Sequence, residues 1–288
     1  MSLWNRARQL KLDDEDFPRA PGLWQADGAR FVCCSPTSVG VVGDAHPRLS
    51  WRPATGPFDP ARCWLIDAGR AWFVCPPDEA STGSGQDAMR PLREVWPLLD
   101  EDEVQAAVSG VALAAWHHGH GFCCACGGET YADAGGWSRT CPVCDSQFFP
   151  RIDPAVIVAL VDNRDRLLLG GQPTWGKMRS VFAGYVMAGE SLEQAVHREV
   201  GEEVGLAIDH VRYFGSQPWP FPRSMMMAFT AHVENPDALH IDGREIVRAD
   251  WYTRDEVRQA YADGCIDPPS PASIARRMID TWLAGELS

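Results

Sequence analysis

The segment SLEQAVHREVGEEVGL, residues 191–206, places carboxylates where a helix is expected to bury apolar side chains. Ser191 and Gln194 form a capping box and Gly205 is a helix stop, so we predict a helix between them. Its apolar face is made of residues at helical spacing: Leu192, Ala195, Val196 and Val200. Three glutamates are predicted to share this face: Glu199, Glu202 and Glu203. Because unpaired buried carboxylates cost free energy, they need a cationic partner.

Divalent cations fit this need. Carboxylates on one helix face form a cage of hard oxygen ligands that suits Mg²⁺ or Mn²⁺. Such ions bridge to a substrate diphosphate and offset its charge. Arg198 is placed to orient a glutamate through a charge-assisted hydrogen bond, and Gly184 allows close approach to the backbone. The sequence therefore predicts a cluster of divalent cations, more than one per site.

The composition limits the other partners of the chain. Its 288 residues, 45% hydrophobic and 23% charged, are typical of a soluble protein long enough for two domains. The net charge of −13 argues against a protein that coats nucleic acid, but permits a small anion bound through metal ions. We see neither a secretory signal nor an apolar run of membrane-spanning length, so we expect a cytoplasmic protein with no membrane partner.

Four cysteines form two Cys-x-x-Cys pairs, Cys123 with Cys126 and Cys141 with Cys144. This spacing predicts a closed, four-thiolate zinc site with a structural role, one per chain. Other ligands remain open from the sequence, although they fit the spacing less well: Cys124, His117, His118 and His120. The rest of the cysteines are expected to be buried thiols and not disulfides: Cys33, Cys34, Cys63, Cys75 and Cys265.

The chain divides into four predicted parts. Residues 1–98 are expected to form an N-terminal α+β domain that is mostly β, because short β-prone runs alternate with turn residues. Residues 99–122 are predicted to be a linker helix and residues 123–148 the zinc ribbon. In residues 149–288 strands alternate with helices, so the fold class combines α+β and α/β features.

From Gly184 the glutamate segment has a defined spacing. It runs Gly184, five residues, Glu190, seven residues, Arg198-Glu199-Val200, one residue, Glu202-Glu203, one residue and Gly205-Leu206. This resembles the signature of Nudix hydrolases at every specified position. The resemblance implies the Nudix fold, a mixed β-sheet sandwiched between helices, and a catalytic group on this segment: Glu190, Arg198, Glu199, Glu202 and Glu203.

The same resemblance implies individual metal ligands. Glu199 and Glu203 would bind Mg²⁺ or Mn²⁺ with Glu202 assisting, and the carbonyl of Ala183 and the carboxylate of Glu245 would complete the site. Taken alone, Glu245 is equally well explained as a surface residue. Met187 stands where many relatives carry an acidic residue, which puts a peripheral contribution to metal binding in doubt.

A second segment, SQPWPFPRS at residues 216–224, narrows the substrate. Its prolines fix a rigid loop that displays Trp219 and Phe221. Rigid aromatic rings suit stacking on a flat base, and the nearby side chains of Gln217 and Ser224 suit its polar edge. From these residues alone, a packing loop or a dimer contact is an equally good explanation.

Taken together, this segment, the glutamate segment and the cysteine pairs resemble the NADH pyrophosphatase family over residues 90–285. The sequences FFPRIDPAVIV and SPASIARRMI match it as well. The resemblance implies a homodimer that hydrolyses NADH or NAD⁺ to nicotinamide mononucleotide and AMP, with activity extending to NAD caps on RNA 5′ ends. It implies that Tyr185 and Trp219 sandwich a base, and that further residues bind substrate: Arg93, Phe149, Gln217, Pro218, Pro220, Phe221, Pro222, Arg223, Ser224 and Ala275. For Arg93, a surface salt bridge is the simpler interpretation.

Two alternatives belong to other functional classes. The first is a Nudix hydrolase of another nucleoside diphosphate derivative, such as a nucleotide sugar, coenzyme A or a nucleoside triphosphate. The second is a zinc-ribbon regulator that binds RNA and carries an inert Nudix domain. The sequence ranks neither the dinucleotide substrates nor Mg²⁺ against Mn²⁺, and it does not explain the N-terminal domain.

Overall fold

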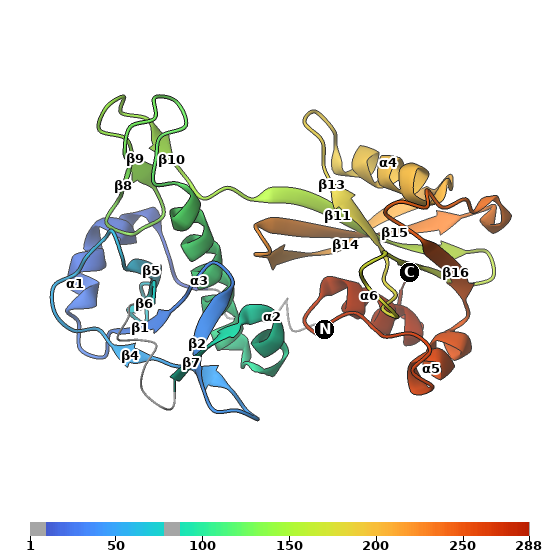
Figure 1. The fold of residues 1–288 in the computed structure, drawn as a ribbon, viewed down its shortest axis with the longest axis horizontal. Coiled ribbons are helices and arrows are strands. Elements are labelled where there is room, and N and C mark those ends of the chain that lie inside the picture. The colour runs from blue at the N-terminus through green and yellow to red at the C-terminus, as the bar shows by residue number, and fades with distance from the viewer. Residues whose placement is uncertain (1–9, 78–86, 288) are drawn as a thin grey trace. The chain divides into compact units, whose positions relative to one another are not determined.

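The computed structural model describes residues 10–77 and 87–287. Contacts between residues divide the chain into two units. The first comprises Met1–Ile152 with Trp219–Arg223, and the second comprises Asp153–Pro218 with Ser224–Ser288. Figure 1 labels the elements of both units. The helices of the described residues lack an apolar stretch of the length that spans a membrane.

The N-terminal part of the first unit contains two small sheets, as the alternating β-prone runs predict. The first sheet has the order β4-β1-β6-β5, and its strands are β1 (Arg30–Cys33), β4 (Arg52–Pro53), β5 (Trp64–Asp67) and β6 (Trp72–Cys75). The second has the order β3-β2-β7, with β2 (Ser38–Val42), β3 (Arg48–Leu49) and β7 (Asp87–Pro91). Among the described residues, short helices accompany them: η2 (Asp14–Arg19), α1 (Ala20–Trp24), α2 (Leu92–Val95) and η4 (Trp96–Leu98).

The helix predicted at residues 99–122 is α3 (Glu101–Gly119). Acidic residues occupy its first turn, where their negative charges interact favourably with the helix dipole. Ala106, Ala107 and Val111 are fully buried, and the helix contacts strands of both small sheets. It is therefore a core element of the first unit. The ribbon follows as a three-stranded sheet of order β10-β9-β8, with β8 (Tyr131–Ala132), β9 (Arg139–Thr140) and β10 (Gln147–Phe148). The four-part division of the chain stays a proposal.

Two of the cysteines expected to be thiols are not. Cys63 and Cys75 form a disulfide, so that prediction was wrong for this pair. The antiparallel register of β5 and β6 pairs Trp64 with Val74, which brings the neighbouring cysteines opposite each other. Spacing along the chain does not reveal such a cross-strand pairing. The prediction of burial holds for Cys33 and Cys34, whereas Cys265 is exposed.

The second unit is a six-stranded mixed sheet between helices, and this agrees with the expected fold. Its order is β14-β15-β11-β12-β16, with β13 paired to β11. The strands are β11 (Asp153–Asp162), β12 (Leu167–Gly171), β13 (Phe182–Tyr185), β14 (Asp209–Trp219), β15 (Ser224–Val233) and β16 (Arg248–Tyr252). β11 runs parallel to β15 and antiparallel to β12 and β13.

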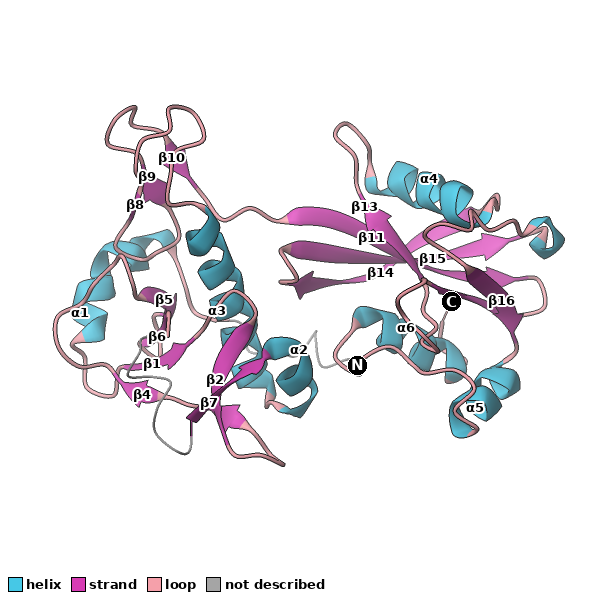
Figure 2. Cartoon of the chain, in the orientation of Figure 1, coloured by secondary structure: helices cyan, strands magenta, loops and turns pink. Residues whose placement is uncertain are grey.

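Helices cover both faces of this sheet. Figure 2 shows α4 (Leu192–Val204) on one face and α5 (Arg254–Ala262) with α6 (Ile274–Leu283) on the other. Alternate residues of β11 therefore enter two separate cores, with Val156 and Val158 facing one and Ile157 and Ala159 the other. A short 3-10 turn, η5 (Pro236–Ala238), follows β15. α5 has no counterpart among the predicted elements, although a capping box marks its start.

Candidate functional site

The glutamate helix forms as its sequence predicts. Ser191 caps α4 by accepting a hydrogen bond from the Gln194 amide, and the Gln194 side chain returns the contact. The helix ends at Gly205, whose φ of 65° lies in the left-handed region. Ala195, Val196 and Val200 are fully buried against the sheet. The capped ends and the apolar face fix the rotation of the helix, and hence which glutamates point inward.

Two of the three glutamates lie on the buried face. Glu199 and Glu203 are only 9% and 3% exposed, whereas 59% of the Glu202 side chain is exposed. The prediction that all three share one face was therefore wrong for Glu202. At about 100° per residue, Glu203 turns only about 40° from Glu199, but Glu202 turns about 60° to the other side. Glu202 thus lies at the rim of the carboxylate cluster.

Arg198 holds these glutamates in position. Its Nε donates to Glu190 Oε1 at 2.6 Å, and Nη2 donates to Glu190 Oε2 and to the Tyr185 carbonyl, both at 2.9 Å. Nη1 donates to Glu199 Oε1 at 2.8 Å and to Glu202 Oε2 at 3.0 Å. These bonds engage all five N–H groups of the guanidinium. Arg198 therefore fixes three carboxylates relative to the end of β13.

Glu190 holds the Arg198 guanidinium in place through two hydrogen bonds. The bidentate pair lowers the pKa of Glu190 to about 2, with help from the Met187 amide, which donates to Glu190 Oε2 at 2.8 Å. The carboxylate therefore stays ionised and closes the turn that precedes α4. We assign Glu190 and Arg198 to positioning. Met187 is exposed and contributes its backbone to this turn.

Gly184 lies directly beneath Glu199. A Cβ atom at position 184 would overlap with the Glu199 carboxylate. Only glycine allows strand β13 and helix α4 to bring the carboxylate this close to the backbone. The neighbouring Ala183 is exposed at the same edge of β13, paired with Ile157. Its carbonyl as a metal ligand stays a proposal.

Glu203 is the most deeply buried carboxylate of the group. Its Oε2 atom is buried and has no hydrogen-bond partner among the described residues. Burial raises the pKa of Glu203 to about 8, and the nearby carboxylates Glu199 and Glu245 add to the shift. Burial also raises the pKa of Glu199, against the opposing effect of Arg198. A buried, unpaired carboxylate beside others is a fit for a divalent cation, which would satisfy the orphaned oxygen.

Asp242 is a member of this site that the sequence analysis missed. Its carboxylate accepts the amides of Glu245 at 3.0 Å and Ile246 at 2.9 Å, and its own amide donates to the Glu203 carbonyl at 3.1 Å. The amide contacts lower the pKa of Asp242. Asp242 therefore ties the turn that carries Glu245 to the end of α4. The signal was the Asp-Gly turn in IDGREI.

The raised pKa of Glu203 predicts a pH-dependent stability. With Mg²⁺ and Mn²⁺ withheld, its folded pKa of about 8 exceeds the unfolded value near 4.5, so folding favours the protonated form. The contribution is full below about pH 4.5 and is lost as pH rises through about 8. We expect the melting temperature of wild type to fall relative to Glu203→Gln between pH 5 and 9. Parallel curves would contradict this.

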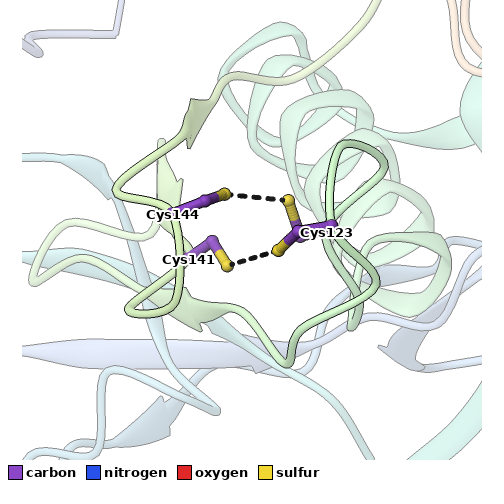
Figure 3. Close-up of side chains that lie close together, drawn as sticks. Cys123, Cys141 and Cys144 are labelled. Atoms are coloured by element: carbon purple, nitrogen blue, oxygen red, sulfur yellow. Dashed lines mark hydrogen bonds between the residues drawn. The ribbon is translucent and has the colours of Figure 1, made fainter.

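The four cysteines of the ribbon come together as predicted. Their Sγ atoms all lie within 4.8 Å of one another, with Cys123–Cys144 at 3.6 Å and Cys126–Cys141 at 3.5 Å. Figure 3 shows thiols of both Cys-x-x-Cys pairs pointing toward each other. A zinc tetrahedron with bonds of about 2.3 Å has sulfur–sulfur edges of about 3.8 Å. The cluster therefore fits a zinc ion with no open coordination position.

The alternative ligands lie elsewhere. Cys124 is exposed and outside the cluster. His117 is buried, with Nε2 2.8 Å from the Gly136 carbonyl and Nδ1 2.9 Å from the Arg139 guanidinium. Burial lowers the pKa of His117 to about 4, so its ring stays neutral and joins α3 to the ribbon. His120 contacts the Trp116 carbonyl through Nδ1, and His118 is exposed.

Replacing Cys126 with serine is expected to remove zinc. A four-thiolate site contributes its binding free energy to folding, so the bound zinc should fall from about one to none per chain and the melting temperature should drop. Activity per folded molecule should change little. Elemental analysis and thermal melts measure this, with Cys124→Ser as a matched control that keeps both values. A stable Cys126→Ser variant with full zinc would contradict the assignment.

The loop at residues 216–224 is held differently from our expectation. Gln217 is fully buried: its Nε2 donates to the Ala272 carbonyl at 2.7 Å, and its Oε1 accepts the Ile274 amide at 2.6 Å. Its amide group joins β14 to the start of α6 and is not free for the polar edge of a base. Ala275 is likewise buried in the core beneath α6.

The other predicted substrate residues divide by exposure. Phe149 and Tyr185 are 55% and 52% exposed, and the Tyr185 hydroxyl lies 3.2 Å from Ser224 Oγ. Trp219 and Phe221 are half-buried with rings edge to face at 5.2 Å. The Arg93 guanidinium lies over both rings, 4.4 Å from the centroid of Phe221 and 5.7 Å from that of Trp219. Of the remaining loop residues, Pro220 is buried. Three are exposed: Pro218, Pro222 and Arg223.

Residues 151–270 match the family model described as the NUDIX domain. The chain is 43% identical over 204 residues to the protein of Mycobacterium bovis (strain BCG / Pasteur 1173P2) named NAD-capped RNA hydrolase NudC. That match covers 68% of this chain and 65% of the mycobacterial one, so the chain spans less than two thirds of that relative.

Proteins with the same name from two further bacteria are similar. The Escherichia coli O157:H7 protein is 40% identical over 188 residues, covering 65% of this chain and 69% of that one. The Klebsiella pneumoniae (strain 342) protein is 37% identical over 203 residues, covering 69% of this chain and 75% of that one.

Proposed function

The chain belongs to the family of Nudix proteins that includes the NudC hydrolases, and from this we propose that it hydrolyses NADH or NAD⁺ to nicotinamide mononucleotide and AMP. The observation that carries the proposal is the buried Glu203 carboxylate, unpaired among the described residues and set beside Glu199 at the end of α4. Because these relatives are named for action on NAD-capped RNA, we extend the proposal to NAD caps on RNA 5′ ends.

We assign the carboxylates Glu199, Glu203 and Glu245, with the Ala183 carbonyl, to Mg²⁺ or Mn²⁺. When bound, these ions offset the diphosphate charge and make a water molecule more acidic. Arg198 orients Glu199 through the 2.8 Å hydrogen bond from Nη1. Glu202, exposed at the rim, is the glutamate to which we assign the transfer of a proton from water. The unpaired Glu203 oxygen and the hydrogen bond from Arg198 to Glu199 support these roles, which the resemblance to Nudix hydrolases suggests.

Substrate recognition is proposed for aromatic residues that are exposed or half-buried. Trp219 and Tyr185 would stack on a base, Phe149 would contact the substrate, and Ser224 would fix the Tyr185 hydroxyl. Arg93 has no carboxylate partner among the described residues, so its guanidinium is available to a phosphate group. We assign supporting roles in the loop to Pro218, Pro220, Phe221, Pro222 and Arg223, whereas the buried Gln217 and Ala275 belong to the packing of α6.

Replacing Trp219 with alanine tests the stacking role. Loss of base stacking costs about 1–3 kcal/mol, or roughly five- to 150-fold. Because stacking stabilises the bound ground state, the KM for NADH should rise by this factor while kcat changes less. Tyr213→Ala is the matched control, since Tyr213 is an exposed aromatic residue of the same strand that we place outside the site. Unchanged NADH kinetics in Trp219→Ala would leave the loop with a packing role.

One panel of substrates tests the function itself. AMP released from NADH and NAD⁺ is measured by chromatography with Mg²⁺ or Mn²⁺, beside pyrophosphate release from nucleoside triphosphates and cleavage of coenzyme A and a nucleotide sugar. Preference for the dinucleotides supports the proposal, and preference for another substrate refutes it. Tight RNA binding without any metal-dependent turnover would instead indicate the regulator. The proposal further includes a cytoplasmic location, a homodimer and one zinc per chain. Sedimentation measures the oligomeric state, and elemental analysis measures the zinc content.

A further inference from the structure

Trp219 packs on a tryptophan that no sequence motif indicates. The ring centroids of Trp96 and Trp219 lie 5.6 Å apart with an interplanar angle of 37°. Trp96 is 4% exposed and begins the turn η4, directly after Val95, which is fully buried. Both tryptophans belong to the first unit, because Trp219–Arg223 is grouped with it. A fixed, buried ring therefore supports a half-buried one.

The loop has few other means of fixing the Trp219 ring. Prolines at 218, 220 and 222 have no amide hydrogen to donate, and the Phe221 amide is already bonded to the Trp219 carbonyl at 2.7 Å. The orientation of the indole therefore depends on side-chain contacts. These contacts include the Trp96 ring at 5.6 Å, the Phe221 ring at 5.2 Å and the Arg93 guanidinium at 5.7 Å.

We propose that Trp96 is a positioning residue that fixes the plane of the Trp219 ring for stacking on the substrate base. The inference rests on the proposed function. A ring held in its binding orientation loses little rotational freedom when the substrate arrives, whereas a free ring loses more and binds more weakly. Trp96 thereby gives the N-terminal part of the chain a role in substrate binding without contact to the substrate.

A double-mutant cycle tests this role. Ordering one side chain costs about 0.5–1.5 kcal/mol, so Trp96→Leu should raise the KM for NADH about two- to twelvefold with kcat nearly unchanged. In a Trp219→Ala background the ring that Trp96 positions is gone, so Trp96→Leu should have no further effect on KM. An equal KM increase in both backgrounds, or none in either, overturns the proposal.

Two further variants separate positioning from general stability. Trp24→Leu removes another buried tryptophan of the first unit, packed on Phe73 and Phe58, and should lower the melting temperature without changing KM. Trp96→Phe keeps an aromatic support and should restore most of the affinity for NADH. If Trp96→Leu does not fold, Trp96→Phe is carried through the same cycle. A KM that Trp96→Phe fails to restore, in a folded protein, counts against positioning by an aromatic ring.

A spectroscopic measurement is independent of turnover. Two indole rings at 5.6 Å couple their transitions, so circular dichroism of wild type minus Trp96→Phe should match wild type minus Trp219→Phe in the coupled band. Absence of a shared band overturns the contact. Wild type that does not hydrolyse NADH refutes the proposed function, whereas active wild type with an additive cycle refutes only the role of Trp96.

Discussion

Glu203→Gln is expected to lower NADH hydrolysis by roughly three or more decades while the fold survives. Glutamine keeps the size of the side chain but removes the charge that holds a cation. Glu203 is 3% exposed, so no other group can easily reach the position of its carboxylate. Without metal the variant should be more stable than wild type near neutral pH, because Glu203 with its raised pKa must take up a proton on folding and glutamine need not. AMP release at saturating Mg²⁺ measures the loss.

Thermal melts give a second readout of the same change. Mg²⁺ should raise the melting temperature of wild type, and that of Glu203→Gln much less, because ligand binding to the native state stabilises it. Glu193→Gln is the matched control: Glu193 lies in the first turn of the same helix and is exposed. It should leave turnover and the Mg²⁺ effect unchanged. Near-wild-type turnover in Glu203→Gln would refute the metal cage on α4.

Gly184→Ala is expected to lower hydrolysis by about a hundredfold or more. The added Cβ would occupy the place of the Glu199 carboxylate, so either the carboxylate or strand β13 must move. A displacement of about 1 Å at a catalytic group costs on the order of 10²-fold in rate. Because β13 carries Ala183 as well, two proposed ligands would be displaced together. Steady-state kinetics and Mg²⁺ titration measure the effect.

The matched control is Gly201→Ala. Gly201 lies on α4 between Glu199 and Glu202, and a Cβ there meets nothing within 4 Å. Alanine is favoured over glycine in a helix by about 1 kcal/mol, so this variant should be fully active and somewhat more stable. Equal activity in Gly184→Ala and Gly201→Ala would show that the close approach of Glu199 to the backbone is not needed.

Local signals predicted most of the glutamate helix. The capping box, the glycine stop and the helical spacing depend on neighbouring residues, so α4 and its buried face follow from the sequence. The prediction for Glu202 was wrong because of its angular position around the helix axis. Steps of three and of four lead to opposite sides of a residue, and only packing decides which side is buried. The ribbon was predicted because four thiolates at this spacing have few other arrangements.

Contacts between distant segments were not predictable in the same way. Gln217 was expected to face substrate, but the start of α6, over fifty residues later, takes both of its amide atoms. The disulfide of Cys63 and Cys75 depends on the register of two strands. Trp96 lies in WPLL, which has no motif, and only the fold brings it to Trp219. In each case the deciding partner is far away in sequence.

The five residues Trp219–Arg223 are grouped with the first unit, although they include the last residue of β14 and the turn that connects it to β15. Exchange of parts between homologues is therefore constrained. A chimaera joined at Ile152 would combine one parent's Trp96 and Arg93 with the other parent's proline loop, and the indole would meet a foreign surface. Recombination would have to move residues 219–223 together with the N-terminal segment. Substitutions at Arg93 or Trp96 are thus expected to covary with substitutions in residues 219–223.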